Sequence, residues 1–207
     1  MIKKLLPLSL LLGVAFASYG SNSDSKDSGK VENAKTNASQ ISSKNSCPTS
    51  QDIKTINMKD MTLSYFKYQD HICGTLKVDL SANETWSKEG SGWFAAGFGA
   101  PSMKGSNMFI FVPKNTDVKN TKYDIFANVG GGYGPTKPLN TKPKAGQIKI
   151  LSSSLGKVSF VLYPNKVEGL SSDDKNIEMI FSHSKAGVTE FVPGHIAKYA
   201  NQTLDLS

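Results

Sequence analysis

The chain has 207 residues, a length that fits one domain of roughly 100–200 residues. Its formal net charge is +7, and all 24 of its basic residues are lysine. Arginine is the preferred side chain for bidentate contacts to phosphate and guanine, so its absence argues against nucleic acid as a partner.

The first 17 residues have the pattern of a signal peptide. Two lysines precede a mainly apolar stretch over residues 5–14, and the small-x-small sequence Ala15-Phe16-Ala17 follows. This stretch is shorter than the ~20 apolar residues that a membrane-spanning helix requires. We therefore expect cleavage before Ser18 and a periplasmic or secreted protein that does not span a membrane.

Residues 18–46 are rich in Ser, Asn, Lys and Asp and contain almost no large apolar side chain. Such a segment cannot bury enough surface to offset the entropy of folding, so we expect a disordered linker. The folded domain is expected to cover residues 47–207. In an oxidising compartment its two cysteines, Cys47 and Cys73, are expected to form a disulfide. Neither belongs to a CxxC or CxxCH motif, which excludes covalent haem attachment of the c type.

From residue 47 onward, short runs of alternating apolar and polar residues are separated by Gly, Pro and Asn. Period-two alternation with β-branched and aromatic residues indicates strands. No window carries a helical stripe of useful length. The pattern predicts an all-β fold, a mainly antiparallel sandwich or closed barrel. The expected strands cover residues 61–68, 72–80, 93–98, 108–112, 123–129, 147–151, 157–163, 177–181 and 203–206.

The motifs of common catalytic chemistry are missing from the sequence. It contains no Gly-x-Ser-x-Gly elbow, HExxH helix, phosphate-binding loop or EF-hand loop. Its three histidines are scattered, whereas hydrolytic metal sites usually need clustered histidine and carboxylate ligands. A redox or ligand-binding module is therefore favoured over an enzyme that acts through its own side chains.

One ordered set of features extends over nearly the whole expected domain, from about residue 61 to residue 206. The strand GWFAAGFG at 92–99 leads into a small-polar turn with Met103 and then into MFIFV at 108–112, and late in the chain His195 precedes the LDL strand at 204–206. This order and spacing resemble the DOMON family. The resemblance implies an immunoglobulin-like antiparallel β-sandwich outside the cytoplasm that binds haem b or sugars, similar to the cytochrome domain of cellobiose dehydrogenase.

In haem-binding DOMON members, the methionine after the Gly-Phe strand and the late histidine are the axial iron ligands. The matching residues here are Met103 and His195. A thioether and an imidazole together leave no open iron position and raise the reduction potential, which suits electron transfer. The redox partner would then be a separate protein. The residues expected to wall a non-covalently bound haem are Trp93, Phe98, Met108, Phe109 and Tyr133.

Two alternatives stay open at this point. Met108 is the rival sulfur ligand, and His183 is the rival imidazole. A haem-free module could instead bind a carbohydrate or another protein of the cell envelope, with the aromatic rings of Trp86, Trp93 and Tyr133 as a sugar platform. The sequence leaves the oligomeric state open.

Overall fold

The computed structural model describes residues 47–49, 51–131, 141–190 and 197–207. The expected signal peptide and linker, residues 1–46, lie outside this part of the chain. Among the described residues, no helix is both long and apolar enough to cross a membrane.

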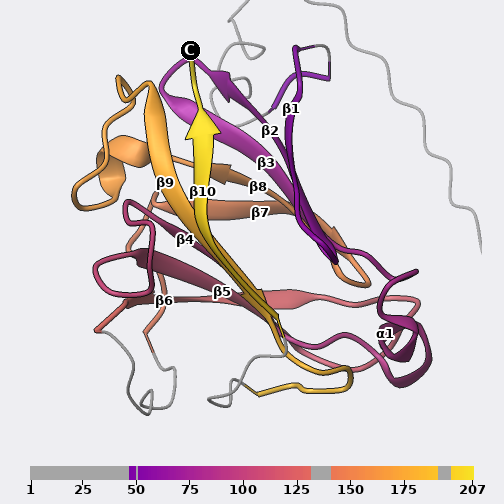
Figure 1. Ribbon diagram of the computed structural model, residues 1–207. Helices are drawn as coiled ribbons and strands as arrows, with labels where there is room; N and C mark the ends of the chain where they lie inside the picture. The colour runs from indigo at the N-terminus through magenta and orange to yellow at the C-terminus, as the bar shows by residue number, and fades with distance from the viewer. Residues whose placement is uncertain (1–46, 50, 132–140, 191–196) are drawn as a thin grey trace, which may run out of the picture. The chain divides into compact units, whose positions relative to one another are not determined.

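The described strands form two five-stranded antiparallel sheets (Figure 1). Sheet A has the order β1-β2-β3-β8-β7, and sheet B has the order β10-β9-β4-β5-β6. The expected all-β antiparallel sandwich is therefore confirmed. The elements are β1 (Lys54–Asn57), β2 (Met61–Tyr68), β3 (His71–Val78), α1 (Glu84–Glu89), β4 (Phe94–Phe98), β5 (Asn107–Pro113), β6 (Tyr123–Val129), β7 (Ile148–Ser154), β8 (Lys157–Leu162), the 3₁₀ turn η2 (Pro164–Lys166), β9 (Asn176–His183) and β10 (Ala197–Asp205).

The main core lies between the two sheets and follows from the alternation of side chains along each strand. Every second residue of a strand points to the same face, and the large apolar residues take the inward positions. Burying each of them contributes roughly 1.5–3 kcal/mol. The largest fully buried side chains of this core are Trp86, Phe94, Phe98, Phe109, Phe111, Phe160 and Phe181.

The strands expected from the sequence agree with the structure within a few residues, but three elements of the structure were not expected or begin elsewhere. The sequence pattern does not predict strand β1, residues 54–57, because it is a short edge strand with alternating half-buried and exposed positions. Helix α1 has only six residues, too few for a helical stripe. Strand β10 begins at Ala197 rather than near residue 203, because a register shift between Tyr199 and Gln202 interrupts its alternation.

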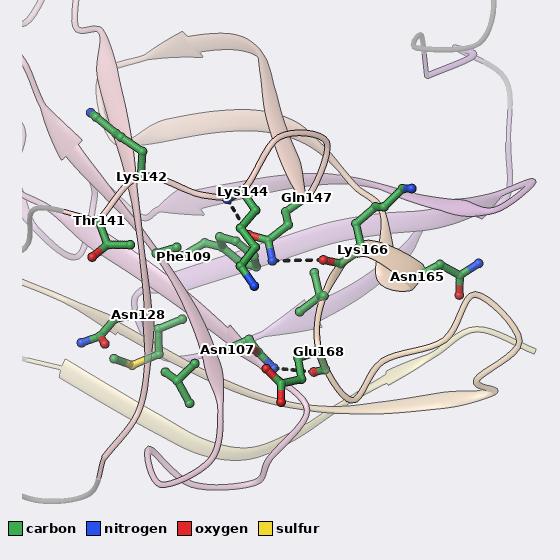
Figure 2. A pocket seen from close by; sticks show the side chains of 14 residues that line it. Asn107, Phe109, Asn128, Thr141, Lys142, Lys144, Gln147, Asn165, Lys166 and Glu168 are labelled. Atoms are coloured by element: carbon green, nitrogen blue, oxygen red, sulfur yellow. Dashed lines mark hydrogen bonds between the residues drawn. The ribbon is translucent and has the colours of Figure 1, made fainter.

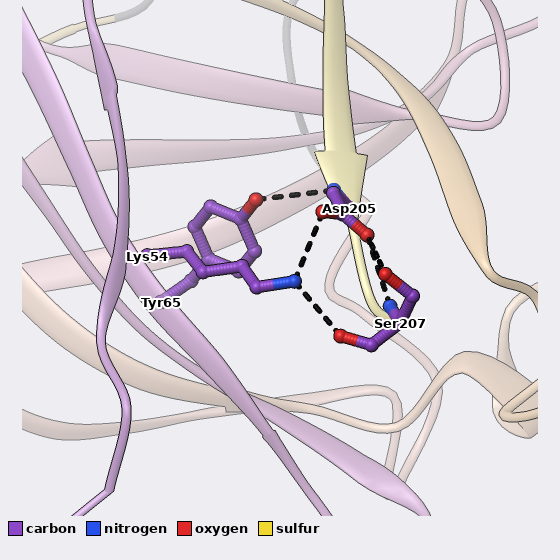
Figure 3. A network of polar contacts seen from close by, with 4 residues as sticks. All are labelled: Lys54, Tyr65, Asp205 and Ser207. Carbon is purple, nitrogen blue, oxygen red and sulfur yellow. Dashed lines mark hydrogen bonds and ion pairs between the residues drawn. The ribbon is translucent and has the colours of Figure 1, made fainter.

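The edge strands β1 of sheet A and β10 of sheet B are joined by a polar cluster (Figure 3). The ammonium of Lys54 lies 3.0 Å from the Asp205 carboxylate and donates to the carbonyl of Ser207. The backbone N–H of Asp205 donates to the hydroxyl of Tyr65 at 3.0 Å. Hydrogen bonds from Ser207 and Lys54 lower the pKa of Asp205 to about 2. This side of the sandwich is therefore closed by direct contacts between the two sheets.

The expected disulfide is confirmed. Cys47 is bonded to Cys73 of β3, with Cα atoms 5.8 Å apart. The bond attaches the first described residues to the middle of sheet A.

Candidate functional site

The outward face of sheet B is apolar, although it faces away from the inter-sheet core. Its residues form cross-strand rows, because residues paired between antiparallel strands share a face. One row contains Ile180, Gly97, Met108 and Asn128. The next contains Lys198, Ser182, Ala95, Ile110 and Phe126. A third row pairs Val112 with Asp124.

We call this surface the outer face of sheet B. It has its own hydrophobic cluster, separate from the main core, in which six residues are almost completely buried: Trp93, Ala95, Met108, Ile110, Val112 and Ile180. The residues of β4 on this face, Ala95 and Gly97, are small, and the Ile180 side chain fills the space beside Gly97, where an added Cβ would lie 2.7 Å from it. A solvent-facing sheet face normally carries polar residues. On the outer face of sheet B, the six apolar residues are instead enclosed and form a second, smaller hydrophobic cluster.

Met103 lies at one end of the outer face. It follows Phe98, the last residue of β4, by five positions and packs half-buried against the outer cluster. Its loop is held at the end of β6, because the N–H of Gly105 donates to the carbonyl of Gly130 at 2.8 Å and the N–H of Gly130 donates to the carbonyl of Ser106 at 2.9 Å. The thioether is thus presented by a loop that backbone hydrogen bonds fix in place.

Strand β10 contacts both the outer cluster and the loop that carries Met103. Ala200 packs against the outer cluster, and the N–H of Asn201 donates to the carbonyl of Pro101 at 3.1 Å. The Met103 loop therefore contacts β10 directly. Strand β10 begins at Ala197, which pairs with His183 of β9, and His183 pairs in turn with Phe94 of β4.

The structure brings together three of the residues expected at the site: Met103, Met108 and Trp93, which share one cluster. It separates two others from them. Phe98 and Phe109 belong to the inter-sheet core. Each follows directly after an outward-facing residue, Gly97 or Met108, and successive side chains of a strand point to opposite faces of the sheet. They support the outer face from behind and do not line it. His195 and Tyr133 lie outside the described residues.

His183, the rival imidazole, is fully buried on the inward face. Its Nδ1 lies 2.9 Å from the Ser184 carbonyl and its Nε2 lies 2.8 Å from the Asp60 carboxylate. Each ring nitrogen therefore has a polar partner within hydrogen-bond distance. The edge of the ring meets Trp86, with centroids 5.7 Å apart. Both nitrogens are occupied, and His183 is unsuited to ligate a metal on the outer face.

Asp60 joins His183 to β10. Its second carboxylate oxygen accepts a hydrogen bond from the hydroxyl of Tyr199. Burial disfavours the carboxylate, but the hydrogen bonds from Tyr199 and His183 outweigh that effect and lower the pKa of Asp60. Burial and the same carboxylate raise the pKa of Tyr199 to about 12. A turn of sheet A thereby holds the first half of β10, next to the bulge that contacts the Met103 loop.

Both tryptophans of the sugar-platform hypothesis are buried in the structure, with Trp86 1% exposed and Trp93 2% exposed. Trp86 closes the inter-sheet core, and Trp93 belongs to the outer cluster. The third residue of that hypothesis, Tyr133, lies outside the described residues.

Charged residues lie along the β6 edge of the outer face. The Asp124 carboxylate is shared by two ammonium groups, at 3.3 Å from Lys114 and 3.4 Å from Lys142. The ammonium of Lys142 also lies 4.0 Å from the centre of the Phe126 ring, which packs against the outer cluster. Sequence analysis missed this group. Asp124 and Phe126 alternate along β6, so the sequence indicates that they lie on the same face of a strand. Only the pairing of β6 with β5 shows that this is the face that carries Val112 and Ile110.

A groove of about 620 Å³ adjoins the same edge and shares Met108 with the outer face. In Figure 2, Lys142 points away from the other groove side chains, whereas the Lys144 side chain extends toward the middle of the groove. Gln147 joins its walls, because its side chain accepts from the N–H of Lys144 and donates to the carbonyl of Lys166. The carboxamide of Asn107 donates likewise to the carbonyl of Glu168. These contacts join the start of β5 and the segment before β7 to the segment at residues 166–168.

No protein-family model matches the chain, and no curated protein matches it in sequence. Among solved structures, it is similar to the cytochrome domain of cellobiose dehydrogenase from Myriococcum thermophilum, with a TM-score of 0.50 and 13% sequence identity. The similarity covers 75% of this chain and 82% of that chain. At this identity it concerns the fold alone. The chain therefore shares its β-sandwich fold with a cytochrome domain.

Proposed function

We propose that this chain is an extracytoplasmic, DOMON-type module that binds haem b without covalent attachment and transfers electrons to a separate redox partner. The observation that carries the proposal is the outer face of sheet B, an apolar surface with the Met103 thioether at its end. The likeness of the fold to a cytochrome domain supports it. The signal-peptide pattern and the disulfide support export.

The residues of the outer face suit a mainly apolar group by their chemistry. Ala95, Ile110 and Ile180 are apolar side chains of one cluster, and Ile180 packs beside Gly97. From Met108 to Val112 the face extends over five residues of β5, which are four steps of the strand or a distance of roughly 13 Å. This length is comparable to that of a tetrapyrrole ring. Apolar side chains on this scale exclude water from the group that they contact.

Met103 and His195 are the proposed axial ligands. Met103 supplies a thioether from a loop that is held by hydrogen bonds to β6. His195 precedes, by two residues, a strand that packs against the same cluster through Ala200. The other two histidines are poor candidates, because His183 is bonded at both nitrogens on the inward face and His71 belongs to β3 of sheet A. When bound, haem with this ligand pair supplies reversible one-electron chemistry at a raised potential.

The test is an absorption spectrum of the mature protein, reconstituted with haem, before and after reduction. We expect the sharp bands of a six-coordinate haem b. Met103→Ala and His195→Ala should each convert the spectrum to that of a haem with fewer ligands. Met58→Leu, in the turn between β1 and β2, is the matched control and should leave the spectrum unchanged. A featureless spectrum from folded protein with excess haem would refute the proposal.

Met108→Leu tests the rival sulfur ligand in the same experiment. Met108 lies in the middle of the outer face and is 6% exposed. Its replacement by leucine conserves volume and should alter haem affinity only slightly. If Met108→Leu removes the six-coordinate spectrum and Met103→Ala does not, the ligand assignment moves to Met108.

A further inference from the structure

We propose that Lys114 and Lys142 bind the propionate groups of the haem, with Asp124 as an internal competitor for the same ammonium groups. The inference rests on the proposed function and assigns the residues that orient the group. An apolar face would account for the binding of the haem ring. It does not determine the orientation of the ring, that is, which edge of the ring faces which strand. A haem has two carboxylates on one edge, so a local excess of positive charge beside the face would select that edge.

The charge excess comes from the contacts around Asp124. Two ammonium groups share its single carboxylate, at 3.3 Å and 3.4 Å, so one positive charge is left over. All three side chains are about half exposed, at 55% for Lys114, 56% for Lys142 and 43% for Asp124. They are therefore accessible to a ligand and can exchange one carboxylate partner for another at little cost in desolvation.

The position of the three groups relative to the outer face follows from the strand register. Asp124 pairs with Val112, and Phe126 pairs with Ile110; both partners belong to the outer cluster. The Lys142 ammonium is held 4.0 Å from the centre of the Phe126 ring. Figure 2 shows the same side chain pointing away from the neighbouring groove. The positive charge thus lies directly at the margin of the apolar surface.

The two ends of the outer face differ in chemistry. Met103 follows the end of β4, beyond the row of Gly97 and Met108. The lysine pair lies at the row of Val112 and Asp124, four residues farther along β5. This arrangement suits an amphipathic ligand with an apolar body and an anionic edge. It predicts that the propionate edge of the haem faces the start of β6 and that the vinyl-bearing edge faces away from it.

The experiment compares the affinity of the apo-protein for haem and for haem dimethyl ester, in which both carboxylates are blocked. Lys114→Gln and Lys142→Gln should each weaken the binding of haem by roughly three- to fivefold, as expected for a half-exposed ion pair. Asp124→Asn should strengthen it by a similar factor, because it removes the competing carboxylate. None of the three changes should alter the affinity for the ester.

Two further measurements separate a specific contact from a general effect of charge. Lys157→Gln removes one positive charge from β8 of sheet A and should leave the affinity for haem unchanged. Lys142→Arg should preserve most of it. Added salt should weaken the binding of haem in the wild type, because it screens exposed charges, and should have less effect in the double lysine variant.

The outcomes distinguish the failure of this inference from the failure of the proposed function. If neither haem nor its ester binds, the haem function is wrong. If both bind and the ratio of their affinities is unchanged by Lys114→Gln, Lys142→Gln and Asp124→Asn, the haem function stands and the assignment of the propionate contacts is overturned. Circular dichroism of each apo-variant checks that the sandwich is intact.

Discussion

His183 of sheet B and Asp60, in the turn between β1 and β2 of sheet A, meet across the sandwich, with the imidazole Nε2 2.8 Å from the carboxylate. The pair is almost enclosed, since the His183 side chain is 0% exposed and the Asp60 side chain 13% exposed. Removing one partner of a buried hydrogen bond leaves the other polar group unsatisfied, which typically costs about 1–3 kcal/mol. The contact is therefore expected to be one of the main polar links between the sheets.

Asp60→Asn should lower the free energy of unfolding at pH 7 by about 1–3 kcal/mol, because the hydrogen bonds of the carboxylate to His183 and Tyr199 are weakened or lost, measured by urea denaturation. The pKa of Asp60 is lowered in the folded protein, so its stabilising contribution is present above its ordinary value of about 3.9 and disappears as the pH falls through the lower folded-state pKa. The difference between wild type and variant should accordingly shrink in acid. An equal difference at pH 7 and in strong acid would contradict this assignment.

Tyr123 should make the fold sensitive to alkali. Burial raises its pKa to about 12, although its hydroxyl meets Ser91 and accepts from the N–H of Gly156 at 3.0 Å. A raised pKa stabilises the fold fully below pH 10, and this contribution is lost as the pH rises toward 12. A tenfold change in a proton-binding constant corresponds to about 1.4 kcal/mol, so the loss of stability is on the order of 3 kcal/mol.

Tyr123→Phe tests this by comparing the free energy of unfolding at neutral and alkaline pH. At neutral pH the variant should be less stable by about 1–3 kcal/mol, because the N–H of Gly156 and the Ser91 hydroxyl lose a buried partner. Above pH 10 its further loss of stability should be smaller than that of the wild type. Tyr199, whose pKa is also raised to about 12, accounts for the remainder. Parallel alkaline curves would argue against a role for Tyr123.

The disulfide should stabilise the domain mainly by restricting the unfolded chain. Its cysteines are 26 residues apart, and closing a loop of that length corresponds to about 3.5 kcal/mol. The double variant Cys47→Ser/Cys73→Ser should be destabilised by this amount, as should wild-type protein unfolded in the presence of a reductant. If reductant has no effect on wild-type unfolding, the bond does not contribute to stability.

Gly130 should be essential to the conformation of the Met103 loop. A Cβ atom at this position would overlap the backbone carbonyl of Met103, whereas a Cβ atom at Gly131 would meet nothing within 4 Å. Gly130→Ala should displace the loop and lower the free energy of unfolding by about 1–3 kcal/mol, the usual cost of overpacking. Gly131→Ala is the matched control and should have little effect. NMR chemical shifts of residues 101–106 would report the displacement directly, and equal shifts in both variants would refute it.

The elements of the fold could be predicted from the sequence wherever the alternation was clear. Runs such as MTLSYFKY at 61–68 and YDIFANV at 123–129 contain the period of a strand within a few residues, so the all-β class and most strand positions were predictable. The cysteine pair was also readable, because two cysteines allow one pairing. Helix α1 and the first half of β10 could not be predicted, since a six-residue helix and a bulged strand leave no periodic pattern.

The candidate site depended on tertiary structure. The strand WFAAGF at 93–98 alternates between two apolar faces, so the sequence could not tell that Trp93 belongs to the outer cluster and Phe98 to the inter-sheet core. The contact of Lys114 and Lys142 with Asp124 was equally hidden, because these residues come from different segments that meet only beside paired β5 and β6. Local periodicity follows from side-chain direction along one strand. Which face is covered, and which charges meet there, follows only from the packing of strands that are distant in the chain.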